Sequence, residues 1–134
     1  ATEGAFHTYF MVTAARLCRA DLDAVPFAAP AVDVLSNYSA GPHGAGADSI
    51  RTRLFFQLFN PVNWVGCLQA AVAGGVDCFV EFGGGLGTGE GPAAKRPNLE
   101  GIVKKTLKSA GHEAAYVAAI NSETLRTAAA AFPA

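Results

Sequence analysis

A histidine near the start of the chain carries the pattern best suited to catalysis. His7 follows Gly4, Ala5 and Phe6, and a helical pattern of apolar residues begins near Phe10. A histidine between a turn of small residues and a helix start has a restricted backbone, so its ring can be directed at one point. Imidazole titrates near neutral pH, so such a ring can act as a general base or acid. The alternative is a partly buried histidine whose ring bonds a loop carbonyl.

The composition indicates a globular chain of one domain or less. It has 134 residues, of which 51% are hydrophobic and 16% charged, enough to bury a core. The formal net charge of −1 gives no general attraction to nucleic acid or to an anionic membrane, so a charged partner must be met by a local patch. No apolar run approaches the ~20 residues that span a bilayer. We therefore expect a soluble protein that binds neither nucleic acid nor membrane.

The cysteines and the amino end add little chemistry. Cys18, Cys67 and Cys78 are an odd number without a C-x-x-C pair, and each has apolar neighbours, so we expect neither a disulfide framework nor a metal site. The chain begins at Ala1, without an initiator Met and without a signal-peptide pattern. This start is compatible with a missing beginning.

The apolar spacing predicts helices that alternate with short strands. Helices are expected at about 10–25, 50–58, 62–72, 99–108 and 123–132, and strands at 31–35, 76–82 and 114–120. This alternation predicts an α/β fold with a short, mainly parallel sheet of about three strands flanked by helices. Three strands are few for a complete α/β enzyme domain, which suggests a piece of something larger.

Local signals mark the ends of these elements. Asp48 or Ser49, Asn98 and Ser122 are expected to cap the helices that follow them, and Gly74-Gly75 to end the helix before them.

Four further expectations concern loops, an arginine and a glycine-rich turn. The segment 39–47 is expected to be a surface loop with His43 in solvent, and 88–97 a flexible excursion. Arg51 is expected to point outward from its helix. Gly83-Gly84-Gly85 follows a strand, but the offsets of a nucleotide-binding motif are absent, so a phosphate cradle is disfavoured.

Five blocks then occur in a fixed order along nearly the whole chain. They are Gly4–Thr8 with Met11, Ala14 and Ala15; Ser36-Asn37; Ile50-Arg51 leading to Gln57-Leu58 and Asn60–Trp64; Gly75-Val76 with Phe79–Gly83; and Leu99–Lys105. In this order they resemble malonyl-CoA:acyl carrier protein transacylases and related acyltransferase domains.

The resemblance implies a fold and a position within it. Residues 1–134 would be the C-terminal part of the family's hydrolase-like, three-layer α/β large subdomain. The family's G-x-S-x-G nucleophile elbow, its malonyl-gripping arginine and its ferredoxin-like small lobe would precede Ala1. No Gly-x-Ser-x-Gly occurs here, so the chain alone is expected to be inactive. Gly83-Gly84-Gly85 departs from the family's Gly-Pro-Gly, 86–97 is an extra loop, and Thr13 replaces a usual proline.

The resemblance also implies a mechanism. A serine attacks the thioester of malonyl-CoA with help from a histidine, here His7, and malonyl then passes to the phosphopantetheine thiol of acyl carrier protein in fatty acid biosynthesis. A main-chain carbonyl that orients this histidine would belong to Gln57. Helix-end capping is the other reading of Gln57. No cofactor is expected.

Other positions are assigned by the same resemblance. Phe6 and Asn37 would bind substrate, and an aromatic residue before the histidine goes with malonyl rather than methylmalonyl. Lys104 and Lys105 would lie where the acidic carrier protein docks, although a solvated helix face explains them equally well. The implied partners are acyl carrier protein, malonyl-CoA and the missing N-terminal half.

Two alternatives stay open. The chain could be a non-catalytic structural or carrier-protein-binding remnant, with His7 incidental, or a piece of a polyketide synthase acyltransferase. The implied compartment is the bacterial cytoplasm, or a plastid or mitochondrion in a eukaryote.

Overall fold

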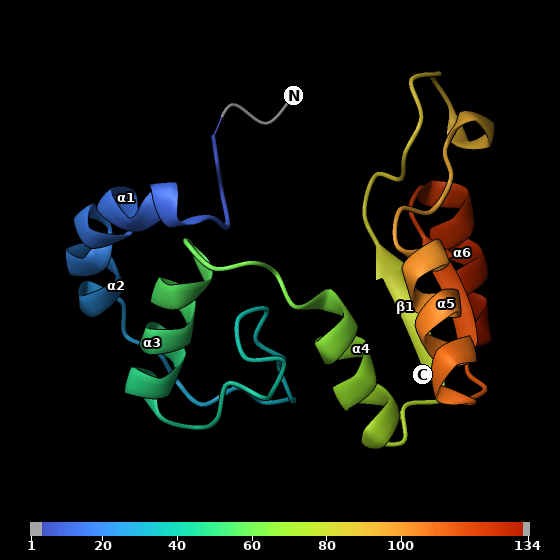
Figure 1. Ribbon diagram of the computed structural model, residues 1–134. Helices are drawn as coiled ribbons and strands as arrows, with labels where there is room; N and C mark the ends of the chain where they lie inside the picture. Colours follow the sequence, from blue (N-terminus) through green and yellow to red (C-terminus); the bar gives the residue numbers. More distant parts are fainter. Residues whose placement is uncertain (1–3, 133–134) are drawn as a thin grey trace. The chain divides into compact units, whose positions relative to one another are not determined.

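The computed structural model describes residues 4–132 and divides into two compact units (Figure 1). The first unit is Ala1–Ala70 and the second Ala71–Ala134, with the boundary inside helix α4 (Trp64–Ala73).

The first unit begins with three short helical pieces instead of the one long helix expected at 10–25. They are η1 (Tyr9–Met11), α1 (Val12–Leu17) and α2 (Arg19–Ala24), and the last ends just before Pro26, as predicted. The break at Cys18 is a local distortion, because the Cys18 N–H still donates to Ala14 O at 3.0 Å.

The apolar stripe of this segment is not the core face that the sequence predicted. Phe10 and Leu17 are 67% and 76% exposed, and across η1, α1 and α2, all within the described residues, Ala15 alone is buried. Helical spacing shows which residues share a face, but it does not supply a neighbour to cover that face.

The strand predicted at 31–35 is wrong. The segment forms a tight loop in which Leu35 and Pro42 make an isolated antiparallel bridge, and Val32 is 73% exposed. A β-favouring run becomes a strand only where a partner strand pairs with it, and within residues 4–132 this run finds a single bridge.

Helix α3 (Ala47–Gln57) departs from the sequence expectation at its start and on its face. Its N-cap is Gly46 without a side-chain bond, and Ser49 instead donates its hydroxyl to His43 O at 2.6 Å. Arg51 does not point into solvent. Its side chain is 19% exposed and bonds main-chain carbonyls near the end of α2.

The second unit contains a parallel pair of strands flanked by helices, which confirms the α/β class. Strand β1 (Cys78–Phe82) pairs with β2 (Ala115–Ala119), from Cys78 beside Ala115 to Phe82 beside Ala119. The described residues form two strands in this sheet instead of the three expected, since the run at 31–35 does not join it.

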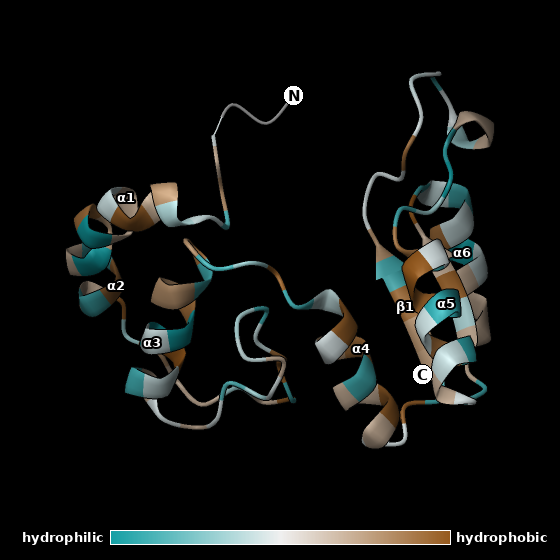
Figure 2. Cartoon of the chain, viewed as in Figure 1, coloured by the Kyte–Doolittle hydropathy of each residue, from teal (hydrophilic) through white to brown (hydrophobic). Residues whose placement is uncertain are grey.

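Helices α5 (Glu100–Ala110) and α6 (Ser122–Ala131) lie on opposite faces of this sheet (Figure 1). Glu81 faces the start of α5, whereas Val80 and Phe82 line an apolar groove with α6. Successive strand side chains alternate between faces, which places the two helices on opposite sides. Figure 2 colours β1 as hydrophobic over most of its length, as expected for a covered parallel strand.

The helix ends in this unit correct two predicted caps. Asn98 makes no side-chain cap for α5, and Glu81 from β1 accepts the Asn98 and Leu99 N–H groups, each at 2.8 Å. Asn121, not Ser122, caps α6 through a capping box with Thr124. Gly75, which follows α4, has the left-handed backbone predicted for it, with φ of 79°.

The predicted excursion at 88–97 is tied at its base. Leu86 and Arg96 exchange two main-chain hydrogen bonds of 2.8 and 3.0 Å, and a short helix, η2 (Pro92–Ala94), lies inside the loop. Over residues 4–132, the structure contains no helix that is both long enough and apolar enough to span a membrane.

Candidate functional site

His7 is held by the end of α3. Its backbone is left-handed, with φ of 62°, and its N–H donates to Leu58 O at 3.1 Å. Its ring Nδ1 lies 2.7 Å from Gln57 O. A non-glycine residue with positive φ is uncommon and costs conformational energy, so two contacts to neighbouring carbonyls explain why it persists here.

Gln57 and Leu58 are suited to this role because of their place in the helix. The last carbonyls of an α-helix have no N–H partner within the helix and must bond something else. Here the main chain and ring of His7 supply two donors. The contact predicted between His7 and the Gln57 carbonyl is present, and its place at a helix end agrees with the capping interpretation as well.

The contact decides where the proton of a neutral His7 ring lies. A carbonyl oxygen only accepts hydrogen bonds, so Nδ1 must carry the hydrogen. The second nitrogen, Nε2, then holds the free lone pair, and Nε2 makes no hydrogen bond to any of residues 4–132. The ring is half-buried rather than sealed in the interior. This tautomer leaves Nε2 able to take a proton from a hydroxyl group.

Side-chain bonds stiffen both sides of the contact. Thr8 donates its hydroxyl to Ala5 O at 2.7 Å and so closes the turn that carries His7. On the α3 side, Asn60 Nδ2 donates to Phe56 O at 2.7 Å, and the Phe56 ring stacks on Tyr38 at 5.3 Å.

The two residues expected to bind substrate differ in their exposure. Phe6 is 52% exposed beside Gly4, where an added Cβ would lie 2.8 Å from the Phe6 ring. Asn37 is half-buried in a turn, and its main-chain oxygen accepts the Asn63 N–H at 2.8 Å. Their role in substrate binding stays a prediction.

The predicted docking lysines lie on α5 in the second unit. Lys104 and Lys105 are both exposed, and Lys104 Nζ lies 2.5 Å from a Glu100 carboxylate oxygen. Lys104 therefore has its charge partly offset, whereas Lys105 belongs to no ion pair among the described residues.

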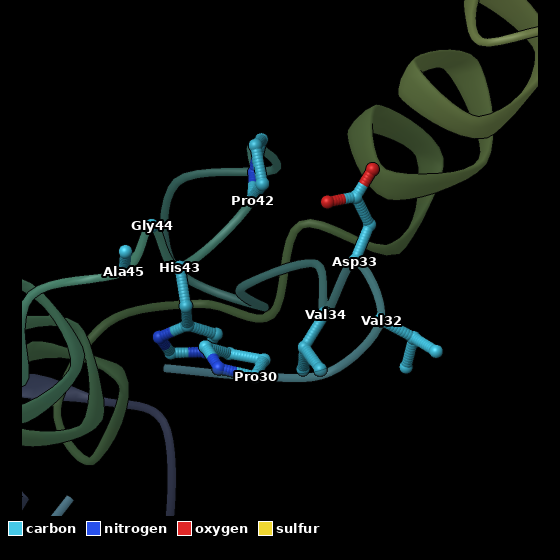
Figure 3. A pocket seen from close by; sticks show the side chains of 8 residues that line it. All are labelled: Pro30, Val32, Asp33, Val34, Pro42, His43, Gly44 and Ala45. Atoms are coloured by element: carbon cyan, nitrogen blue, oxygen red, sulfur yellow. The ribbon is translucent and has the colours of Figure 1, made fainter. Parts of the chain in front are cut away.

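Sequence reasoning was wrong about His43, which it placed in solvent. The residue is 7% exposed and lines a pocket of about 260 Å³ together with Pro30 (Figure 3). Burial, and then the nearby Arg53 charge, lower the pKa of His43, and its Nδ1 has no partner within residues 4–132. The glycines and polar residues of this segment predict a loop, but they do not predict the burial of His43 within it.

No group of three His, Cys, Asp or Glu residues able to hold a metal ion occurs within 4–132, and the three cysteines are unpaired.

Comparison with known proteins supplies a family. No protein-family model matches the chain. The malonyl CoA-acyl carrier protein transacylase of Bacillus subtilis is 34% identical over 102 residues, which cover 76% of this chain and 28% of that protein.

Solved structures agree in fold. The transacylase of Xanthomonas oryzae pv. oryzae matches with a TM-score of 0.74 and 25% identity over 96% of this chain and 36% of its own. A malonyl-transacylase solved in complex with its type II polyketide synthase acyl carrier protein matches with a TM-score of 0.77 and 23% identity, over the same shares. By sequence and by fold, this chain therefore belongs with the malonyl-CoA:acyl carrier protein transacylases, of whose length it spans about one third.

Proposed function

We propose that the protein to which this chain belongs transfers malonyl from CoA to the phosphopantetheine thiol of acyl carrier protein, with His7 as general base and acid. The observation that carries the proposal is the 2.7 Å contact between His7 Nδ1 and Gln57 O, which leaves Nε2 free. In this proposal, the catalytic serine lies on a portion of the protein N-terminal to this chain.

Each proton in the proposed reaction passes through Nε2. As the serine oxygen attacks the malonyl thioester carbon, Nε2 takes the hydroxyl proton, and the imidazolium then returns it to the departing CoA thiolate. In the second half, Nε2 takes the proton of the carrier thiol as its sulfur attacks the malonyl-serine ester, and returns it to the serine oxygen. The Gln57 carbonyl dipole stabilises the transient imidazolium through Nδ1–H. These steps exchange one acyl group and need no cofactor.

The same proposal assigns the other predicted residues. Phe6 and Asn37 contact the malonyl group, and Phe6 fills the space of an α-methyl, which favours malonyl by roughly 1–3 kcal/mol. Lys104 and Lys105 attract the acidic carrier protein and mainly raise its association rate, so their effect falls as salt screens them. The 134-residue chain alone, without the serine, is inactive.

The test uses this chain joined to the N-terminal portion that contains the serine. The protein is incubated with malonyl-CoA, and the malonyl adduct is followed by intact mass. His7→Ala should slow adduct formation by about 10²- to 10⁴-fold, the usual share of a general base. His112→Gln is the control, since His112 bonds Val76 O in the second unit and has no assigned role in the reaction. Equal rates for His7→Ala and the control would remove His7 from the mechanism and favour the non-catalytic alternative.

Docking is tested separately. Charge reversal of Lys105 should slow malonyl transfer to the carrier protein at low salt, but it should not slow formation of the malonyl adduct on the serine. Unchanged transfer would show that α5 is only a solvated helix face.

A further inference from the structure

We propose that Arg51 is a positioning residue for the reaction, which holds the α1–α2 segment on α3 so that His7 stays against Gln57. This inference rests on the proposed role of His7, and it concerns a residue that does not touch the reacting atoms.

The guanidinium group of Arg51 links α3 to the end of α2 through two of its three nitrogens. Its Nε donates to Leu22 O at 3.2 Å and one terminal nitrogen to Val25 O at 2.9 Å. The other terminal nitrogen lies 3.0 Å from Asp48 on α3. The guanidinium therefore binds the negative end of the α2 dipole and satisfies carbonyls that helix α2 leaves free.

The aromatic contacts extend this attachment. The Arg51 guanidinium lies 5.6 Å from the centre of the Phe27 ring, just after α2. Arg19, at the other end of α2, lies 5.4 Å over the Phe55 ring of α3. Cations over aromatic faces add a modest attraction.

These contacts run along α3 in reverse chain order. Near the start of α3, Arg51 meets the end of α2. One turn further on, Phe55 meets the start of α2 through Arg19, and at the end of α3, Gln57 meets His7. Figure 1 shows helix α2 beside helix α3. The segment from His7 to Val25 is thus bound to α3 at both ends, by Gln57 at His7 and by Arg51 at Val25. The Arg51 contact is the one farthest along α3 from His7.

Apolar burial within this chain is only one part of the attachment. Ala15 is the one buried residue of η1, α1 and α2, whereas Phe10 and Leu17 are exposed. The polar contacts of Arg51 therefore add to the positioning of the segment. Without them the segment can pivot about its His7 end, and a shift of about 1 Å at a catalytic group can cost about 10²-fold in rate.

The experiment compares Arg51→Met with Arg53→Met in the chain joined to its serine-bearing portion. Arg53 is a matched control two residues away on α3. Its guanidinium bonds Pro42 O and makes no hydrogen bond to α2 within residues 4–132. Arg51→Met should lower kcat for malonyl transfer about 10- to 100-fold, with KM for malonyl-CoA changed less than about twofold. Arg51→Lys keeps the positive charge but lacks the several N–H donors of the guanidinium group, so its kcat should lie between those of wild type and Arg51→Met. It also serves if Arg51→Met does not fold.

A second readout separates positioning from mere loss of stability. In the folded 134-residue chain, ¹⁵N-detected histidine spectra report the tautomer of His7, and Arg51→Met should reduce the population with hydrogen on Nδ1. The double variant with His7→Ala should be no slower than His7→Ala alone.

Equal kcat in the two arginine variants, or a slower Arg51→Met with an unchanged His7 tautomer, would overturn the inference. Failure of the proposed function appears differently, as full activity in His7→Ala.

Discussion

Glu81 offers the sharpest stability prediction because one carboxylate joins three elements. The side chain is 8% exposed and accepts the N–H groups of Asn98 and Leu99 at 2.8 Å each, together with the Tyr116 hydroxyl of β2. β1 thereby caps α5 and bonds β2 through a single charged group.

The Glu81→Gln variant keeps the size of the side chain but removes its charge and one acceptor oxygen. One partly buried donor then loses its partner, at a cost of about 1–3 kcal/mol. The lost attraction between the carboxylate and the helix N-terminus adds about 0.3–1 kcal/mol, and more where the pair is partly buried. We expect the free energy of unfolding to fall by about 1–4 kcal/mol, a large part of the ~5–15 kcal/mol that stabilises a typical domain.

The assay is urea unfolding of the 134-residue chain, followed by circular dichroism at pH 7. Glu113→Gln is the matched control, because Glu113 is exposed in the same unit and loses the same charge. If Glu81→Gln lowers the free energy of unfolding no more than Glu113→Gln does, the proposed role of the Glu81 carboxylate is wrong.

The pH dependence of Glu81 adds a second check. Burial alone would raise the pKa of Glu81, but the hydrogen bonds from Tyr116, Asn98 and Leu99 outweigh it, and the pKa falls below its ordinary value of 4.5. The carboxylate therefore stabilises the folded chain above about pH 4.5, and this stability is lost as pH falls through the folded-state pKa. The difference in unfolding free energy between wild type and Glu81→Gln should therefore become smaller in that acid range.

Three further predictions concern a thiol, a histidine and substrate choice. Burial raises the pKa of the Cys67 thiol, so a thiol reagent should modify exposed Cys18 well before Cys67 in the native chain, and equal rates would contradict the described burial. Burial and then the Arg53 charge lower the pKa of His43, so the folded chain resists its protonation and loses stability as pH falls below about 6.5. His43→Gln should make the urea unfolding midpoint depend less on pH between pH 7 and 5. An unchanged pH dependence would contradict this role of His43. Phe6→Ala should reduce the preference for malonyl over methylmalonyl by up to about 10- to 200-fold in competition assays, and an unchanged ratio would exclude Phe6 from selectivity.

Elements with local signals were predictable from the sequence. The strands around Val80 and Val117 and the glycine end of α4 follow from β-branched runs and from the left-handed freedom of Gly75. The His7–Gln57 contact was anticipated through the family resemblance, and helix-end chemistry explains it.

Long-range partners were not predictable from spacing. Glu81 caps a helix 17 residues away, and Arg51 reaches carbonyls 26 and 29 residues earlier. Neither pairing follows from the spacing of apolar residues, so Asn98 was predicted to cap α5 and Arg51 to point outward. The run at 31–35 failed for the same reason, since a strand depends on a neighbour that its own residues do not encode.

The tautomer of His7 is the most direct test of the central claim. A ¹⁵N–¹H correlation spectrum of the 134-residue chain, at a pH where the ring is neutral, distinguishes hydrogen on Nδ1 from hydrogen on Nε2. The Gln57 carbonyl predicts hydrogen on Nδ1 and a free lone pair on Nε2. A ring with its hydrogen on Nε2, or one that averages between both forms, would contradict the account.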